Sequence, residues 1–346
     1  VTTSIDAGGN NFSFNNTGAV EVQSGTLATT TSGTHTGSFN VSSGKTLSFA
    51  GANSFTASSF LGGGGAVNMI NNTQTMVGAN TVTGTSFSVT GATVSGAGSL
   101  ALDSASPLNL SSGTLSTSSV TANGAFNWSG TGVSVLGSGL TVNGGMAITG
   151  SGQKQLNGGT LTLASNSSWD GTGVIRFNSG VITNQSTRIF DVTGDGTIDS
   201  SGGVSSFNNA GTFRKSAGAV TTSIDAGGNN FSFNNTGTVE VQTGTVDVAP
   251  TTTFTQAGTI NVAGVTTFRR TGGFNNPATT GFIQGSGTID VGAGTVTNNG
   301  TIAPGGSGAA GTLSVTGNFT NGSSGLIDIE IGGATAGMTY DVLAVS

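Results

Sequence analysis

The chain has 346 residues, no cysteine, and 62 glycines against only 4 prolines. Only 6% of its residues are charged and the net charge is -6, so it lacks a basic surface able to neutralise a run of phosphates, and we expect no nucleic-acid partner. The absence of thiols excludes disulfides and thiolate metal sites, the glycine content without proline excludes collagen, and no stretch is apolar over the length of a membrane span.

Short segments in which apolar and polar residues alternate run along the chain. A period of two places one set of side chains on a buried face and the other set on a polar face, as in a β-strand. Good helix formers are scarce, while Gly, Thr, Ser, Asn and Val dominate. We therefore expect an ordered, all-β protein, with its clearest strands at Phe12–Phe14, Val20–Val22, Leu161–Leu163, Ile260–Val262, Leu313–Val315 and Ile327–Ile329.

The sequence contains a long internal repeat. Residues 1–18, VTTSIDAGGNNFSFNNTG, recur unchanged as residues 220–237, and the likeness continues so that 1–29 and 220–248 form near-identical repeat units. Reuse of one supersecondary unit is typical of stacked arrays, in which each unit contacts only its neighbours. The repeat therefore favours a protein that works through a surface of stacked units over one that works through a single catalytic pocket.

Five turn signals share one pattern: an inward apolar residue, two polar residues, a small or polar residue, and then Gly. Asn and Gly tolerate a positive φ, so they turn the chain tightly between short strands, and Asn residues stacked at equivalent corners can form ladders. We interpret each signal as a corner of a coil. The corners are Phe14–Gly18, Phe207–Gly211, Phe233–Gly237, Phe254–Gly258 and Val296–Gly300.

The spacing of these corners is typical of a solenoid, with 26 residues from Gly211 to Gly237 (237 minus 211) and 21 from Gly237 to Gly258 (258 minus 237). Roughly 20 residues per coil, stacked at about 4.8 Å, predict on the order of 17 coils. We expect a right-handed parallel β-helix, forming one continuous rod over residues 1–346. The alternative is an antiparallel β-sandwich or a string of Ig-like domains, which would usually show a buried Trp in each domain and visible linkers.

The end of the sequence resembles a known group of proteins. Gly300-Thr-Ile-Ala-Pro-Gly305, Gly311-Thr-Leu-Ser-Val-Thr-Gly317 and Gly325-Leu-Ile-Asp-Ile-Glu-Ile-Gly-Gly333 lie within residues 285–346, which look like C-terminal coils of bacterial surface β-helix proteins. Those proteins are the autotransporter passengers and the filamentous-haemagglutinin-like adhesins. The resemblance implies an architecture more than an activity. The membrane barrel and the N-terminal secretion domain of these families are not in this sequence, which suggests a processed or excerpted part.

An enzyme that cleaves carbohydrate is the sharpest alternative function, because polysaccharide lyases and hydrolases use the same scaffold. Such a site needs clustered carboxylates, or a carboxylate with a basic residue, on adjacent coils. The best cluster is Asp170, Arg176, Arg188, Asp191, Asp195 and Asp199, for which corner charge that aids solubility is the simpler explanation. His35, the only histidine, is expected to be a solvated loop residue.

The segment that begins at Asp191 also copies part of a calcium-binding loop. Asp191, Asp195 and Asp199 are candidate ligands, but Thr193 replaces an acid and Gly202 stands where a bidentate acid would close the site. No other cofactor is expected. The run Gly62–Gly65 lacks the Lys of a phosphate-binding loop and is interpreted as a turn.

These observations favour a non-catalytic, extracellular structural protein, a β-solenoid segment of a bacterial surface fibre or adhesin. Exposed terminal coils present open strand edges, so we expect association end to end into homo-oligomers or filaments. Surface glycans are possible partners. Irregular Thr runs such as Thr81–Thr83 leave a glycan-binding or ice-binding module as a further alternative.

Overall fold

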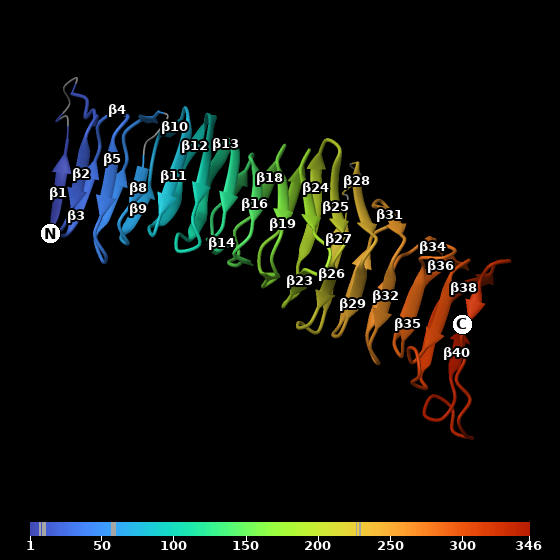
Figure 1. The fold of residues 1–346 in the computed structure, drawn as a ribbon. Helices are drawn as coiled ribbons and strands as arrows, with labels where there is room; N and C mark the ends of the chain where they lie inside the picture. Colours follow the sequence, from blue (N-terminus) through green and yellow to red (C-terminus); the bar gives the residue numbers. More distant parts are fainter. Residues whose placement is uncertain (7, 9–11, 57–59, 226, 228–229) are drawn as a thin grey trace. The chain divides into compact units, whose positions relative to one another are not determined.

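A computed structural model of the chain describes residues 1–6, 8, 12–56, 60–225, 227 and 230–346. These residues contain 40 β-strands and no helix, and the strands stack in parallel as a β-solenoid of about 15 turns, roughly 21 residues apart. The expected parallel β-helix is confirmed, with turns slightly longer and fewer than the predicted coils of roughly 20 residues. The strands are drawn in Figure 1, coloured from blue at the N-terminus to red at the C-terminus. The chain divides into two compact units, Val1–Ser165 and Asn166–Ser346. The single rod over residues 1–346 stays a prediction.

The turns of the first unit contribute strands to three parallel ladders. Two long strands, β12 (Ser86–Leu102) and β13 (Leu108–Ala122), pass through all three. The first ladder also holds β1 (Thr2–Ile5), β3 (Thr26–Thr29), β6 (Thr46–Phe49), β9 (Ala66–Met69), β14 (Phe126–Trp128) and β17 (Met146–Ile148). The second holds β4 (Gly33–His35), β7 (Asn53–Phe55), β10 (Thr73–Met76), β15 (Ser134–Leu136) and β18 (Lys154–Asn157). The third holds β2 (Ala19–Val22), β5 (Ser38–Val41), β8 (Phe60–Gly62), β11 (Ala79–Thr83), β16 (Gly139–Val142) and β19 (Thr160–Leu163).

The second unit is built in the same way, and β36 (Thr288–Asn298) and β38 (Thr312–Asn321) each enter two ladders. Its first ladder holds β20 (Ser167–Trp169), β23 (Ile189–Val192), β26 (Thr212–Lys215), β29 (Thr238–Val241), β32 (Thr259–Val262), β35 (Phe282–Gly285), β37 (Thr301–Pro304) and β39 (Leu326–Ile327). Its second holds β21 (Ile175–Asn178), β24 (Thr197–Gly202), β27 (Thr221–Asp225), β30 (Thr245–Val248), β33 (Thr267–Arg269) and β40 (Val342–Val345). Its third holds β22 (Val181–Asn184), β25 (Ser205–Asn209), β28 (Phe231–Asn235), β31 (Thr253–Gln256) and β34 (Gly273–Asn276).

Parallel pairing excludes the sandwich alternative and places every side chain over its counterpart in the preceding turn. Strands such as β29, β30 and β32 alternate half-buried and buried positions, as their period of two predicted. Phenylalanines therefore stack on phenylalanines, and the ring centroids of Phe207 and Phe233 lie 5.8 Å apart. Two predicted strands are mostly wrong. Phe12–Phe14 contributes only an isolated bridge at Ser13, and β39 ends at Ile327, with Ile329 38% exposed where the chain leaves the ladder.

The third residue of each corner pattern is a buried amide, and in the second unit these amides form the expected ladder. In the second unit Asn184 Nδ2 donates to Asn209 Oδ1 and Asn209 Nδ2 donates to Asn235 Oδ1, both at 2.8 Å. The row ends at Gln256, which accepts from Asn235 at 2.9 Å. A second row runs through Asn276, Asn298 and Asn321 with distances of 2.8 Å. These amides satisfy the polar groups that a corner would otherwise bury without a partner.

The corner glycines serve a purpose other than the expected one. Gly211, Gly237, Gly258 and Gly300 do not adopt a positive φ. A Cβ on Gly237 would instead lie 2.0 Å from the carbonyl oxygen of Gly211 in the preceding turn. Gly is therefore required here by the close approach of two backbones, and the interpretation of these corners as left-handed turns is wrong.

The repeat supplies a matched test of this packing, because Gly18 and Gly237 occupy the same position of one 18-residue sequence and nothing lies within 4 Å of a Cβ on Gly18. We expect Gly237→Ala to lower the free energy of unfolding by about 3 kcal/mol, since backbone atoms would have to shift. Gly18→Ala should leave it unchanged. Urea unfolding of both variants checks this, and equal midpoints would contradict it.

Candidate functional site

The charged residues of the second unit lie in rows that run across neighbouring strands. Asp191 on β23, Arg214 on β26 and Glu240 on β29 are in register. Arg214 donates to both carboxylate oxygens of Asp191, with Nη2 to Oδ2 at 2.7 Å. Partial burial would raise the pKa of Asp191, but hydrogen bonds from Arg214 and Ser216 outweigh it and the pKa is lowered.

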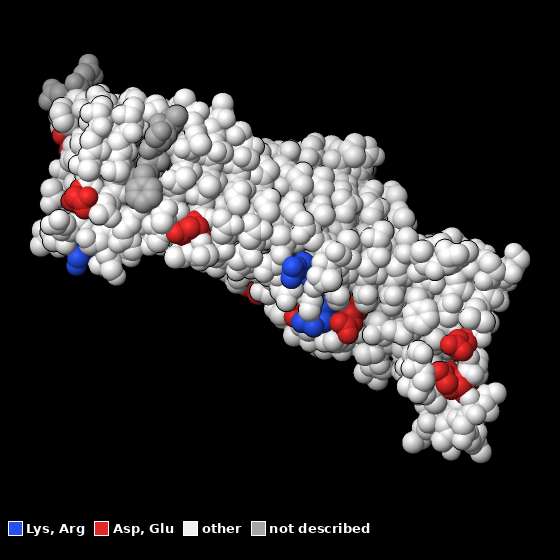
Figure 2. Space-filling model, in the orientation of Figure 1, with Lys and Arg blue, Asp and Glu red and all other residues white. Residues whose placement is uncertain are grey.

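Two further rows follow the same rule. Arg176 on β21 faces Asp199 on β24 with a bidentate contact at 2.9 and 2.6 Å. Arg269 on β33 pairs with Asp247 at 2.6 Å and is in register with Asp290. On the surface in Figure 2 the charged side chains accordingly form a few small patches on an otherwise uncharged surface. Opposite charges in register stabilise neighbouring turns, which is a structural role.

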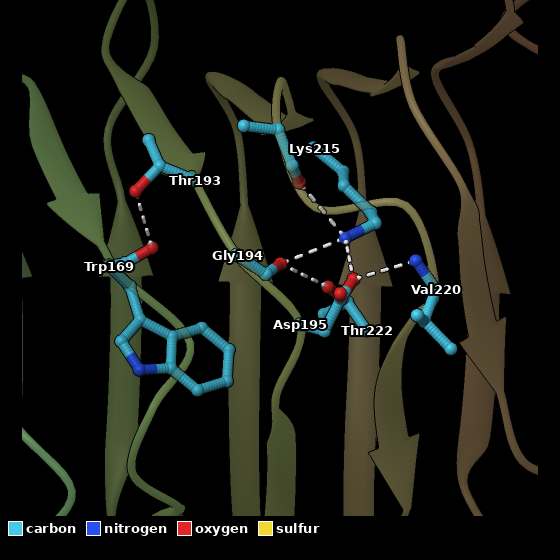
Figure 3. A network of polar contacts seen from close by, with 8 residues as sticks. Trp169, Thr193, Gly194, Asp195, Lys215, Val220 and Thr222 are labelled. Atoms are coloured by element: carbon cyan, nitrogen blue, oxygen red, sulfur yellow. Dashed lines mark hydrogen bonds and ion pairs between the residues drawn. The ribbon is translucent and has the colours of Figure 1, made fainter.

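A corner of the second unit encloses a buried lysine (Figure 3). The side chain of Lys215 is 0% exposed, and its Nζ donates to Asp195 Oδ1 at 2.7 Å, Gly194 O at 2.8 Å and Ala217 O at 3.1 Å. Lys154 in the first unit is equally buried, and its Nζ contacts the carbonyl oxygens of Gly130, Gly150 and Gly152. Each ammonium group has three N–H donors and contacts three backbone or carboxylate acceptors, so each lysine stabilises the conformation of its corner.

The three candidate calcium ligands do not converge. Asp191 binds Arg214, Asp199 binds Arg176, and Asp195 binds Lys215 and the backbone N–H of Val220. Among the residues that the structure describes, no three His, Asp or Glu side chains are grouped so that they could share a metal ion. Calcium binding by Asp191, Asp195 and Asp199 stays a prediction that the geometry does not support.

The carboxylate cluster considered for glycoside cleavage is likewise engaged in local structure. Asp170 Oδ1 accepts from Thr172 N and Thr172 Oγ1 within its own turn, and the backbone N–H of Arg188 donates to Gln185 O. A raised carboxyl pKa occurs elsewhere, at Glu330, which hydrogen-bonds Asp341. Asp341 Oδ1 and Oδ2 also accept the backbone N–H groups of Gly311 and Glu330, so this acid pair fastens the segment before β40.

His35 is not solvated, which corrects the expectation from the sequence. Its side chain is 0% exposed and its ring lies 5.1 to 5.7 Å from those of Phe14, Phe39, Phe49 and Phe55. Nε2 lies 3.1 Å from Asn53 Oδ1, while Nδ1 has no hydrogen-bond partner among the described residues. Asn53 Nδ2 donates to Gly51 O and Gln74 Oε1, so Oδ1 is the acceptor and Nε2 carries the proton. Burial lowers the pKa of His35, although the Asn53 contact opposes the shift.

The first unit presents hydroxyl rows in place of charge rows. On its second ladder Thr73, Thr93 and Thr114 are in register, as are Thr75, Ser95 and Ser116. A shallow hollow of about 340 Å³ lies beside them, lined by Ser13, Asn15, Ser32, Gly33, Thr34, Ala52, Asn53, Ser54, Thr73 and Thr75. No charged or aromatic side chain lines it, so it offers hydrogen bonds but no group that distinguishes one ligand from water.

The two copies of the repeat lie in different surroundings. In the second copy β27 pairs with β24 on one side and β30 on the other, and Phe231 is 1% exposed against Phe177. In the first copy β1 pairs with β3, and Phe12, the counterpart of Phe231, is 51% exposed. The same sequence is thus an interior turn in one place and the first described turn in the other, where Phe12 is exposed.

No protein-family model, curated protein or solved structure matches the chain. The described residues include no helix long and apolar enough to cross a membrane.

The burial of His35 predicts a pH-dependent stability for the first unit. Because the folded-state pKa is lowered from 6.5, the unfolded chain binds the proton more readily, and stability falls as the pH drops through about 6.5 towards the folded value. In His35→Gln this loss should disappear. Urea midpoints at pH 8 and pH 5 for both proteins measure it; an equal acid loss in the variant would show that other groups cause it.

Reversing one ion pair tests the charge rows. Arg176→Asp should lower the free energy of unfolding by about 1 kcal/mol, because two carboxylates would face each other on a partly exposed surface. The double variant Arg176→Asp with Asp199→Arg should recover most of the loss, since Asp225 is in register beyond residue 199. A double-mutant cycle in urea measures the coupling, and its absence would contradict the structural role.

Proposed function

We propose that this chain is a non-catalytic structural segment of an extracellular, bacterial surface fibre or adhesin, and that copies associate end to end. The observation that carries the proposal is the repeat in two settings, with Phe231 covered by a neighbouring turn and Phe12 exposed. A solenoid turn stacked on the open edge of the first copy would cover Phe12 as the neighbouring turn covers Phe231. A second copy of the chain supplies such turns.

Asn321 at the end of an asparagine row and Asn16 in the first copy of the repeat have complementary hydrogen-bonding groups. Asn209 Nδ2 donates to Asn235 Oδ1 inside the second unit, and Asn16 is the counterpart of Asn235 in the first copy of the repeat. Asn321 is the last member of the second row. Its Oδ1 accepts a hydrogen bond from Asn298 Nδ2, and its Nδ2 donates to Gly325 O. An amide has two N–H donors, so Asn321 of one copy can continue the row onto Asn16 of the next.

Other observations support the location and the lack of catalysis. The resemblance of residues 285–346 to autotransporter passengers and filamentous-haemagglutinin-like adhesins favours an exported surface protein. Each acid of the cluster considered for catalysis has a structural partner, as at Asp191, Asp195 and Asp199. Head-to-tail contact between unlike ends also gives an open filament in place of a closed ring when the rotation does not close.

Growth of particle length with concentration tests the association. We expect light scattering and electron microscopy to show filaments that lengthen as the protein is concentrated. Gly18→Ala should stop this growth without unfolding the chain, because a covering turn would bring a carbonyl against the new methyl group, as Gly211 O does at Gly237.

Gly139→Ala is the matched control, since nothing lies within 4 Å of a Cβ there and the residue is away from the open edge. It should assemble like the parent protein. Single particles at every concentration, or filaments of equal length from Gly18→Ala, would refute end-to-end association. Degradation of polysaccharides by the purified chain would refute the non-catalytic assignment.

A further inference from the structure

Three corners of unequal length lie on top of one another near the end of the second unit. Asn276, Asn298 and Asn321 are in register, and so are Phe282, Thr301 and Leu326 after them. From the Asn to the first residue of the next strand, the chain therefore advances six positions in the first turn (282 minus 276), three in the next (301 minus 298) and five in the last (326 minus 321). A short corner between two longer ones leaves a hollow in the surface.

This hollow has a volume of about 300 Å³, at the lower end of the range of small-molecule sites. Its floor is the short corner with Asn299, Gly300 and Thr301. The longer corners form its sides, and the complete lining is Thr279, Thr280, Gly281, Phe282, Asn299, Gly300, Thr301, Ser324 and Leu326.

The shape of the hollow is held by backbone and buried side-chain contacts. Asn276, which is 0% exposed, donates to Gly281 O at 3.3 Å and to Asn298 Oδ1 at 2.8 Å. The N–H of Thr301 donates to Gly281 O at 2.9 Å, and Ser324 Oγ donates to Asn299 O at 2.9 Å. Thr279 has a φ of 66°, which is costly for a β-branched residue and is maintained by this framework. The hollow is therefore preformed.

The lining of the hollow combines two apolar side chains with several uncharged polar groups. Phe282 occupies an outward position of β35 and is half-buried, between Thr259 and Thr301 of the adjacent strands. Leu326, two turns beyond Phe282 on the same row, is 56% exposed. Around these two apolar side chains lie hydroxyl and amide groups, and no lining residue is charged.

We propose that this hollow binds one ring of a neutral glycan. A pyranose has an apolar C–H face that packs on an aromatic ring and a rim of hydroxyls that hydrogen-bond with Thr, Ser and Asn. The uncharged lining offers no partner for a carboxylate, sulfate or phosphate, so an acidic sugar or a nucleotide would lose its hydration without compensation. The proposal goes beyond the fibre function, since it concerns a lateral surface and not the association edge.

The test uses the full chain and a panel of neutral trisaccharides, namely maltotriose, cellotriose and mannotriose, with trigalacturonic acid as the acidic probe. We expect saturation-transfer NMR and calorimetry to detect at least one neutral sugar below about 10 mM. Phe282→Ala should weaken that binding about tenfold, while Phe282→Tyr, which keeps the ring, should retain it.

Thr238→Ala, two turns before Phe282 on the same outward row and outside the hollow, is the control and should bind like the parent chain. Leu326→Ala gives a second test should Phe282→Ala fail to fold, as judged by circular dichroism. No neutral sugar bound by about 10 mM, binding of the acidic probe alone, or equal binding by Phe282→Ala and the parent would overturn the proposal. Filament growth is measured separately on the same variants, so failure of sugar binding and failure of assembly are distinguishable.

Discussion

The in-register parallel ladder is the constraint on which the rest of this molecule depends. It sets each side chain above the equivalent side chain of the preceding turn, so every position must be compatible with its own neighbours along the stack. Phe207 and Phe233 meet as rings, Asn209 and Asn235 as amides, and Arg176 and Asp199 as opposite charges. At the corners the same constraint brings backbones so close that a residue such as Gly237 cannot carry a side chain.

The fold could be predicted from the sequence because the period of two and the corner pattern are local signals that the ladder then repeats. The candidate sites could not, because they depend on which strands become neighbours. Asp191, Asp195 and Asp199 resemble a calcium loop when they are read along the chain, but pairing gives each a different cation. The hollow at Phe282 arises from differences in corner length that have meaning only after the turns are aligned.

The alternation of inward and outward positions along each strand could have revealed the buried polar residues. Lys154 stands two residues before buried Leu156, and Lys215 two residues after buried Phe213, so both share the inward parity. Lysine side chains are usually exposed, so residue type favoured an outward position for both. The carbonyl oxygens that accept their hydrogen bonds come from corners whose positions the sequence does not give. The comparison of Phe12 with Phe231 makes the same point, since one sequence has two exposures according to the turn beside it.

The interior location of two lysines affects how this protein can be handled. The chain has three lysines, at positions 45, 154 and 215, and the last two are 0% exposed. Of the three lysines, only Lys45 should therefore react with reagents that couple to primary amines in the folded protein. Lys45 belongs to the first unit, so dyes, beads or crosslinkers attached through lysine would be placed there, while the lysine of the second unit stays unmodified.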